Sequence, residues 1–318
     1  MTIKQPFPVF SEFHEIKGIY EPSAAEQMPD GRIFVVEDET AHAVAILTLR
    51  GDGSFEVERL DVETFFTPIL DRTKPRIPDD FEGMAIDNDG YVFAITSHSR
   101  GKDGKIYPQR EQFIRFKLDG NEPREMAAYG NLKADISAVH PLLAESVGIT
   151  DVKNAGGFNI EGLAFDRNEQ AMLIGFRSPQ ADGKAVLVWL ENPRDLFEGG
   201  ARAAIGSEMI LLNLKGDGVR GMAYDPKLEG FLIISGPASR ARTLNFGLWF
   251  WSGEAGIEPV PVEIPVPGTE IRRGECVSPT RCNGNDLVLL MRDDGNKKKE
   301  KYAHYMFLTY DQIRMGSR

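Results

Sequence analysis

The sequence predicts an all-β protein, a five-bladed β-propeller with a short helical insert. Three observations carry this prediction. A segment of the type Glu/Arg-Gly-apolar-Ala-apolar-Asp recurs along the chain, a turn and an apolar run follow each copy, and further strand-like segments complete each unit. Four antiparallel strands repeated at intervals of about 55–60 residues are typical of propeller blades.

The recurring segment marks the innermost strand of each blade. Its clearest copies are "EGMAID", "EGLAFD" and "RGMAYD", which begin at Glu82, Glu161 and Arg220, and two weaker copies begin at Ser23 and Glu275. The intervals between the five starts are 59, 79, 59 and 55 residues. Gly and Ala suit innermost strands because the blades converge there. A six-bladed ring is the alternative, with a degenerate blade inside the longest interval.

The remaining strands of each unit follow in order. Second strands are expected at "RIFVVED", "YVFAITS", "AMLIGFR", "FLIISG" and "LVLLMRD", and third strands at "AVAILTL", "QFIRFKL", "AVLVWL", "GLWFW" and "YMFLTY". Fourth strands are expected at "FEVERLDV", "MILLNL" and "EPVPVEI". The last unit lacks a fourth strand. The N-terminal "SEFHEIKGIY" can supply it, which closes the ring and removes an open sheet edge.

The longest interval contains the helical insert. Apolar residues fall at helical spacing in residues 131–149, and Pro141 interrupts them, so two short helices are expected. The segment "NPRDLFEGG" predicts one more helical turn, with Asn192 as its cap and Pro193 at its first position. We expect these segments to be insertions in a single propeller domain that spans residues 1–318.

Composition narrows the classes of partner. The net charge of −11 disfavours nucleic acid, because an acidic surface repels phosphate backbones. The N-terminus has no basic segment followed by an apolar one, and no apolar run approaches the roughly 18 residues that span a bilayer. We therefore expect a cytoplasmic protein without a membrane partner. Two cysteines, Cys276 and Cys282, form no disulfide framework.

Charged residues gather at one end of the predicted ring. The residues that begin innermost strands surround the mouth of the central channel, and the loops between second and third strands lie on the same face. The positions expected there are Glu82, Glu161, Arg220 and Glu275 from the strands, and His98, Arg100, Arg177 and Arg292 from the loops. On the opposite face, Asp87, Asp166 and Asp225 are expected to accept backbone N–H bonds in turns.

Three interpretations of the mouth stay open. In the first, its three glutamates are neutralised by Arg177, Arg220 and Arg292 in a ring of ion pairs. In the second, the glutamates at 82, 161 and 275 are ligands of Ca²⁺ or another divalent cation. In the third, the three arginines bind an anionic or polar molecule, and His98 acts as general base or acid.

The segments "EGMAIDNDGYVFAITSHSR", "NIEGLAFD" and "VRGMAYD" resemble an uncharacterised bacterial β-propeller family, domain of unknown function 3616. That family is similar in turn to esterase-like domains related to phytases. A more distant likeness is to calcium-dependent lactonases of the gluconolactonase group, whose E-G-P-x-W glutamate is a metal ligand. Glu82 and Glu161 match that glutamate, but the following proline and tryptophan are absent. The resemblance implies a propeller and leaves the activity open.

The sequence therefore predicts a charged central pocket that binds a small polar or anionic molecule. If the protein is an enzyme, a hydrolase of ester-type bonds (an esterase, phosphoesterase or lactonase) fits best. A carboxylate such as Glu161, or His98, then activates water, and Arg177 or Arg220 stabilises the developing charge. The further ligand-binding candidates are Arg100, Arg292, Glu82 and Glu275. The alternative is a non-catalytic scaffold that holds a protein partner through loop residues such as Arg100 or Arg240.

Overall fold

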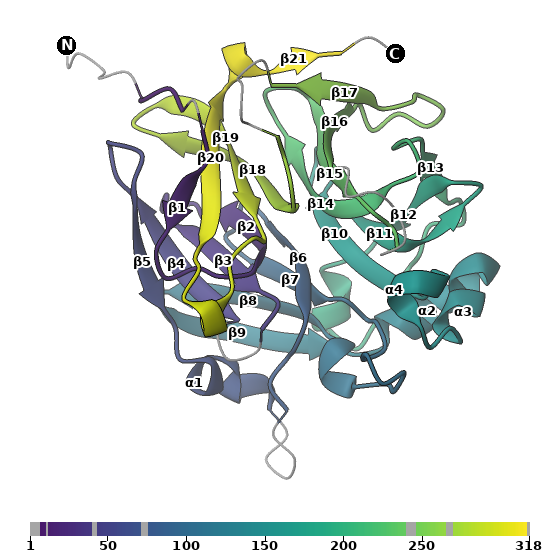
Figure 1. Ribbon diagram of the computed structural model, residues 1–318. Helices are drawn as coiled ribbons and strands as arrows, with labels where there is room; N and C mark the ends of the chain where they lie inside the picture. The colour runs from purple at the N-terminus through teal and green to yellow at the C-terminus, as the bar shows by residue number, and fades with distance from the viewer. Residues whose placement is uncertain are drawn as a thin grey trace.

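Five β-sheets stand around a central axis as the blades of a propeller (Figure 1). The computed structural model describes residues 7–10, 12–39, 43–70, 76–239, 246–264 and 270–316. Among these residues, four sheets have four strands and one has five. The prediction of five blades is confirmed, and the longest interval contains helices rather than a sixth blade.

The blades follow one another along the chain. Blade 1 contains β2 (Pro22–Gln27), β3 (Ile33–Glu37), β4 (Val44–Leu49) and β5 (Phe55–Arg59), and blade 2 contains β6 (Phe81–Ile86), β7 (Val92–Thr96), β8 (Phe113–Asp119) and β9 (Glu122–Tyr129). Blade 3 contains β10 (Asn159–Phe165), β11 (Met172–Ala181), β12 (Lys184–Leu190) and β13 (Ile210–Leu212). Blade 4 contains β14 (Gly218–Asp225), β15 (Gly230–Gly236), β16 (Gly247–Trp251), β17 (Val260–Glu263) and β21 (Arg314–Met315). Blade 5 contains β18 (Gly274–Cys282), β19 (Asn285–Arg292), β20 (Ala303–Thr309) and β1 (His14–Ile16).

The innermost strands are β2, β6, β10, β14 and β18, and each contacts the next around the ring, with β18 against β2. Each of the five starts predicted from the repeat falls within the first three residues of one of these strands. Crowding at the axis explains their small residues. A Cβ atom at Gly221 would overlap the backbone carbonyl oxygen of Glu275 in the neighbouring blade.

The last blade is closed by the N-terminus, as expected. Strand β1 pairs with β20, and His14 lies opposite Tyr305 and Ile16 opposite Ala303. This pairing joins the first strand of the chain to a sheet built from its last hundred residues. The ring is thereby locked by hydrogen bonds between the two ends of the sequence.

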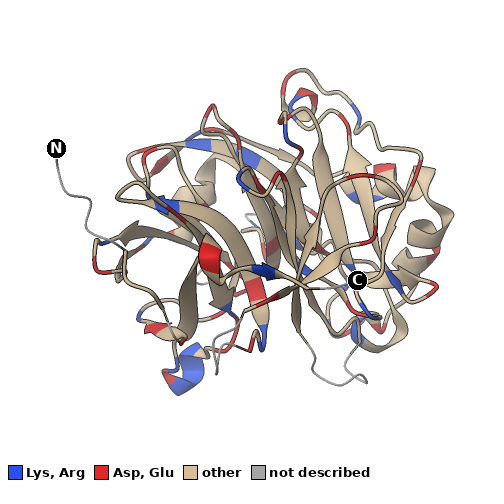
Figure 2. Ribbon diagram, turned by 90° about the horizontal axis from the view of Figure 1, so that it is seen from above, with Lys and Arg blue, Asp and Glu red and all other residues tan. Residues whose placement is uncertain are grey.

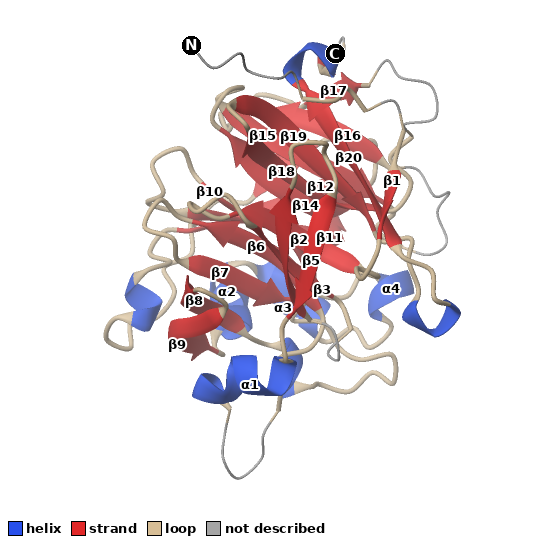
Figure 3. Ribbon diagram, turned by 90° about the vertical axis from the view of Figure 1, so that its left-hand side faces the viewer, coloured by secondary structure: helices blue, strands red, loops and turns tan. Residues whose placement is uncertain are grey.

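The core lies between successive blades (Figure 3). The second strands β3, β7 and β15 are buried along their whole length, as their continuous apolar sequences predict. Between blades 1 and 2, for example, Phe34 packs edge-on against Phe116 with ring centroids 5.4 Å apart. Such contacts fix the spacing of the strand ends that carry the polar residues described below.

Short helices cover the outside of the ring (Figure 3). The α-helices are α1 (Val62–Phe66), α2 (Leu132–Val139), α3 (Pro141–Val147) and α4 (Val152–Ala155). The 3₁₀ turns are η2 (Thr67–Ile69), η3 (Pro108–Arg110), η4 (Asp195–Phe197), η5 (Lys297–Lys299) and η6 (Tyr310–Gln312). Two helices separated at Pro141 are confirmed. In the described part of the chain, no helix has the length and apolar character needed to cross a membrane.

One helical prediction was wrong in its detail. The turn at "NPRDLFEGG" is η4, which begins at Asp195 and not at Pro193. Asn192 does not cap it, because its side chain accepts a hydrogen bond from the backbone N–H of Ala204 at 2.7 Å and donates to the carbonyl of Arg202 at 3.1 Å. Asn192 therefore fastens a loop rather than beginning a helix.

The turns on the opposite face form as expected. Asp87 Oδ1 accepts the backbone N–H of Tyr91 at 2.8 Å. Asp166 and Asp225 accept equivalent backbone bonds within their own turns. These aspartates hold the connections between first and second strands, so their recurrence in the sequence has a structural cause.

Candidate functional site

The charged residues that open the innermost strands meet at the axis and form an interlocked ion-pair network. Arg220 Nη1 lies 2.6 Å from Glu161 Oε2, and Arg220 Nε donates to Glu275 Oε2 at 3.0 Å. Arg177 Nη1 donates to Glu161 Oε1 at 3.1 Å, and Asn159 Nδ2 donates to the same oxygen at 2.6 Å. Two arginines thus tie together strands from blades 3, 4 and 5.

This network closes the central channel. Glu161 is 1% exposed and Glu275 is 4% exposed. The space left at the axis has a volume of about 10 Å³, which holds about one water molecule. Burial lowers the pKa of Arg220, but the charges of Glu161 and Glu275 outweigh that effect and raise it. The expectation of a ligand pocket on the axis is therefore corrected, because paired side chains fill the position.

The same geometry bears on the expected metal ligands. Within the described ranges, no group of three or more His, Cys, Asp or Glu side chains is placed to hold a metal ion. The guanidinium group of Arg220 lies against both Glu161 and Glu275. Glu82, Glu161 and Glu275 all border the narrow axial space, and their binding of Ca²⁺ or another divalent cation stays a prediction.

An open pocket of about 920 Å³ lies beside the axis, between blades 1, 2 and 3. Its wall is formed by the end of β3, the start of β6, the loop after β7 and the segment around α4. Its charged lining consists of Glu21, Asp38, Glu39, Asp79, Asp80, Glu82, Arg100, Lys102, Asp103, Arg110, Asp151 and Lys153. Glu82 also lines the narrow space at the axis, so it marks the boundary between network and pocket.

Figure 2 shows acidic and basic positions distributed over the loops and strand ends. The pocket collects both signs of charge. Carboxyl groups predominate on the side formed by blades 1 and 2, whereas Arg100, Lys102 and Lys153 come from the β7–β8 loop and the helical insert. The pocket is thus not a simple anion site of the kind expected from the mouth arginines.

Two carboxyl groups, those of Asp38 and Asp80, form the polar centre of this pocket. The backbone N–H of Asp80 donates to the carbonyl of Asp38 at 3.3 Å, so the two residues adjoin across blades 1 and 2. Asp80 Oδ2 also accepts from the hydroxyls of Ser97 and Ser99, the latter at 3.3 Å. Arg110 Nη1 lies 3.2 Å from the same oxygen.

The two carboxyl groups have different surroundings. Loss of hydration, and then the charge of Asp80, raise the pKa of Asp38 to about 8. The Asp38 side chain is open to the pocket, so its proton can exchange with solvent. Asp80 instead faces two hydroxyl groups and the guanidinium group of Arg110.

A third carboxyl group, Glu82, adjoins the pair. Burial, and then the charges of Glu161 and Asp80, raise the pKa of Glu82 well above its usual range. Its carboxyl group makes no hydrogen bond or ion pair with the residues that the structure describes. Glu82 therefore presents a protonated carboxyl group between the ion-pair network and the pocket.

The backbone around the pair adopts uncommon conformations. Asp80 has a φ of 65° and His98 a φ of 54°, both in the left-handed region. Aspartate and histidine tolerate this region better than most residues. The turn at Asp80 aligns its N–H with Asp38 and its carbonyl with the N–H of Ser97, at 2.8 Å. The strained backbone thus positions the carboxyl pair between two blades.

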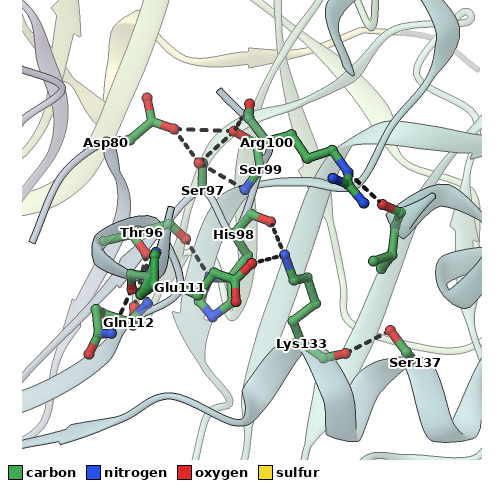
Figure 4. Close-up of polar contacts among 12 residues, drawn as sticks. Asp80, Thr96, Ser97, His98, Ser99, Arg100, Glu111, Gln112, Lys133 and Ser137 are labelled. Atoms are coloured by element: carbon green, nitrogen blue, oxygen red, sulfur yellow. Dashed lines mark hydrogen bonds and ion pairs between the residues drawn. The ribbon is translucent and has the colours of Figure 1, made fainter. Parts of the chain in front are cut away.

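His98 does not have the position expected of a general base. Its side chain is fully buried and is not part of the pocket lining. The imidazole Nδ1 bonds the carbonyl of Thr96 at 2.8 Å, and the ring lies on the far side of the segment from Asp80 (Figure 4). Burial lowers the pKa of His98 to about 4. Ser99, rather than the histidine, lines the pocket.

The expected loop arginines divide among three places. Arg177 belongs to the axial network, where its Nε also donates to the carbonyl of Pro237 at 3.1 Å. Arg100 lines the open pocket. Arg292 does not join the mouth, because its guanidinium lies 3.4 Å from the ring centre of Phe13 and donates to the carbonyl of Glu270. Arg240 lies outside the described residues.

The sequence did not single out Asp80. It lies immediately before β6, in "PDDFEGM", two positions ahead of the recurring glutamate. A second acidic residue just before an innermost strand is the available signal, since that position faces the loops between second and third strands. The proximity of Asp80 to Asp38 depends on the packing of blade 1 against blade 2, which no local pattern in the sequence indicates.

A comparison with models of protein families finds a match to an uncharacterised family. Residues 125–255 match the family model described as "Protein of unknown function (DUF3616)". No curated protein matches the chain. The match covers blade 3, the helical insert and parts of blades 2 and 4. The description of the family names no activity.

Solved structures share the architecture at low identity. A structure described as an oxidoreductase (glucose dehydrogenase) of Thermus thermophilus is 13% identical, with a TM-score of 0.45, over 93% of this chain and 99% of that one. The PQQ-bound aldose sugar dehydrogenase of Streptomyces coelicolor is 14% identical, with a TM-score of 0.43, over 95% and 100% of the two chains. Neither likeness bears on the chemistry of this protein.

Proposed function

We propose that this propeller is a small-molecule hydrolase whose acid and base are Asp38 and Asp80. The observation that carries the proposal is the juxtaposition of Asp38 and Asp80, joined by a backbone hydrogen bond of 3.3 Å, in the wall of the 920 Å³ pocket. The pocket is open to solvent and large enough for a small polar molecule. Ester-type bonds remain the best substrate class, because their hydrolysis needs one group to accept a proton and another to donate one.

The division of protons gives each aspartate a role. Asp80, which faces Arg110, accepts a proton from water while the water oxygen forms a bond to the electrophilic carbon or phosphorus. Asp38 donates its proton to the oxygen of the leaving group as the ester bond breaks. Transfer of one proton from Asp80 to Asp38, directly or through a water molecule, restores the starting state.

Other residues support the pair without reacting. Arg110 bridges Asp79, at 2.8 Å from Nε to Oδ2, and Asp80. It is a positioning residue that orients the Asp80 carboxyl group. Ser99 donates to the same carboxylate and lines the pocket. In the axial network, Glu161 and Arg220 already neutralise each other, so they support the walls of the pocket rather than the reaction.

The test is turnover of an ester panel by matched variants. Nitrophenyl carboxylates, a nitrophenyl phosphate and a lactone are offered to the wild type, Asp80→Asn and Asp38→Asn, with Asp119→Asn as control. Asp119 is an exposed aspartate that ends β8, away from the pocket. Loss of general acid–base catalysis predicts a decrease in kcat of about 100-fold or more for the first two variants.

The control variant Asp119→Asn is expected to retain the wild-type rate. Circular dichroism and thermal unfolding establish that every variant is folded before rates are compared. Turnover that survives Asp80→Asn at the wild-type level contradicts the proposal. So does a wild-type protein that hydrolyses no member of a broad panel, and that result favours the alternative of a protein-binding scaffold.

A further inference from the structure

The pocket has a cationic end that the carboxyl pair does not explain. Arg100 and Lys102 lie in the β7–β8 loop, and Lys153 lies in α4. A Cβ atom at Gly104 in this loop would lie 3.1 Å from the side chain of Thr150, so the two segments pack together. Three basic side chains from separate segments therefore share one side of the pocket.

The charge of Arg100 is held in place but is not neutralised. Its Nε donates to the carbonyl of Val147 and its Nη1 to the carbonyl of Gly104, each at 3.0 Å. Backbone carbonyls orient a guanidinium group but carry no net charge. Arg100 makes no ion pair with the described residues, and Nη2 makes no hydrogen bond with them. A fixed guanidinium with a remaining donor suits an oxyanion.

The two lysines are also available. Neither Lys102 nor Lys153 forms an ion pair with the described residues, whereas Lys105 in the same loop pairs with Asp103 at 3.0 Å. Lys153 lies close enough to Asp38 to lower its pKa, against the larger effect of burial. The cationic end therefore reaches as far as the carboxyl pair.

The nearby acids do not cancel this cationic end. Asp103 and Asp151 come from the same two segments and already have partners, because Asp103 pairs with Lys105 at 3.0 Å and Asp151 accepts from the side chain of Asn154 at 3.0 Å. Asp79 and Asp80 face Arg110, and the pKa values of Asp38 and Glu82 are raised. Exposed acids at the rim act through water and are screened by salt. The pocket thus separates a proton-rich carboxyl side from a positively charged side.

We propose that Arg100, Lys102 and Lys153 bind a phosphate group of the substrate while its scissile ester lies against Asp38 and Asp80. This inference deepens the proposed hydrolase function and rests on it for the position of the reacting bond. A phosphate fits better than a carboxylate, because one guanidinium group and two ammonium groups match a dianion with three terminal oxygens. The substrate class is a phosphorylated polar molecule.

The first measurement uses inorganic phosphate as the probe. At constant ionic strength, phosphate is expected to raise the thermal midpoint of the wild type more than chloride or acetate does, because a ligand of the folded state stabilises it. The same salt is expected to inhibit turnover of a neutral ester competitively. Equal effects of phosphate, acetate and chloride overturn the phosphate site.

Variants separate the two proposals. Arg100→Gln and Lys153→Gln are expected to weaken phosphate inhibition at least about 10-fold, since each removes a charge–charge hydrogen bond. Lys153→Gln guards against misfolding of Arg100→Gln, because the Lys153 side chain makes no hydrogen bond or ion pair with the residues that the structure describes. Lys105→Gln, in the same loop but ion-paired, is the control and keeps wild-type inhibition.

Asp80→Asn gives the opposite pattern. It is expected to abolish hydrolysis and still bind phosphate, as seen by thermal shift. Loss of turnover in Asp80→Asn together with unchanged phosphate binding in both Arg100→Gln and Lys153→Gln refutes the phosphate site alone. Phosphate binding that depends on these cations, combined with undiminished turnover in Asp80→Asn, refutes the carboxyl pair alone.

Discussion

At the scale of single residues, burial decides which titratable groups are charged. His98 is fully buried, and loss of hydration lowers its pKa to about 4. Asp38 opens to the pocket, and loss of hydration, together with the charge of Asp80, raises its pKa to about 8. For Asp38 the result is a carboxylic acid that can donate a proton at neutral pH. For His98 the result is a neutral imidazole whose bond to the Thr96 carbonyl fixes the loop that carries Ser97 and Ser99.

The buried histidine predicts a dependence of stability on pH. Because the pKa of His98 falls from 6.5 to about 4 on folding, the unfolded chain binds more protons between these values. Stability from this group is therefore present above pH 6.5 and is lost as pH falls toward 4. By pH 5 the loss amounts to about 2 kcal/mol.

The measurement is urea unfolding of the wild type and His98→Gln at pH 7 and pH 5. The variant is expected to lose about 2 kcal/mol less than the wild type over this interval. His14→Gln is the control, since His14 is exposed. An identical pH dependence in wild type and His98→Gln would show that His98 is charged in the folded protein.

At the scale of elements, the innermost strands both build the ring and fill its centre. Their small residues let β10, β14 and β18 approach closely, and their leading side chains then lie within ion-pair distance. If the buried arginine is removed, the two buried glutamates lose their cation, and this loss lowers the free energy of unfolding. The charged residues at the recurring position therefore connect blades 3, 4 and 5 through ion pairs.

Removal of the shared cation is predicted to weaken the fold strongly. Arg220→Met leaves Glu161 and Glu275 buried without their main partner, which costs about 3–5 kcal/mol and lowers the thermal midpoint by roughly 5–15 °C. Arg124→Met, at an exposed ion pair with Glu122, is expected to cost under about 1 kcal/mol. A loss in Arg220→Met no larger than in this control would mean that the network contributes little.

Much of this element-level picture is predictable from sequence, and the exceptions share a cause. The small-residue repeat and the aspartate turns are local patterns, so strand positions follow from them. The carboxyl pair was missed because Asp38 and Asp80 meet only through the packing of two blades. The position of Arg292 was predicted wrongly because its partner Phe13 lies in the distant N-terminal segment. The cap at Asn192 was predicted wrongly because the Asn192 side chain accepts a hydrogen bond from Ala204, later in the same loop.

At the scale of the whole molecule, the ring is a closed structure whose ends depend on each other. Strand β1 covers the edge of β20, and Ile16 in β1 is 2% exposed. The aromatic rings of Phe7 and Phe10 pack on Phe307 of the same blade, with centroids 5.3 and 5.6 Å apart. The N-terminal segment is thus part of the core of blade 5.

Truncation tests this closure. Deletion of residues 1–17 exposes the edge of β20 and removes Phe7, Phe10 and Ile16 from the core, so a fall in thermal midpoint of more than roughly 10 °C and aggregation are expected. Deletion of residues 1–6 leaves β1 and both phenylalanines in place and is the control. A protein without residues 1–17 that melts like the control would show that the ring does not need β1.

Asp38 as the acid and Asp80 as the base form the centre of the proposed reaction. The pH dependence of kcat/KM for the best ester of the panel, in wild type and Asp38→Asn, tests this pair. We expect a bell-shaped profile for the wild type with its alkaline limb near the Asp38 pKa of about 8, and a rate in Asp38→Asn that is at least about 100-fold lower and lacks that limb. A wild-type rate that still rises above pH 8, or an alkaline limb that persists in Asp38→Asn, would contradict it.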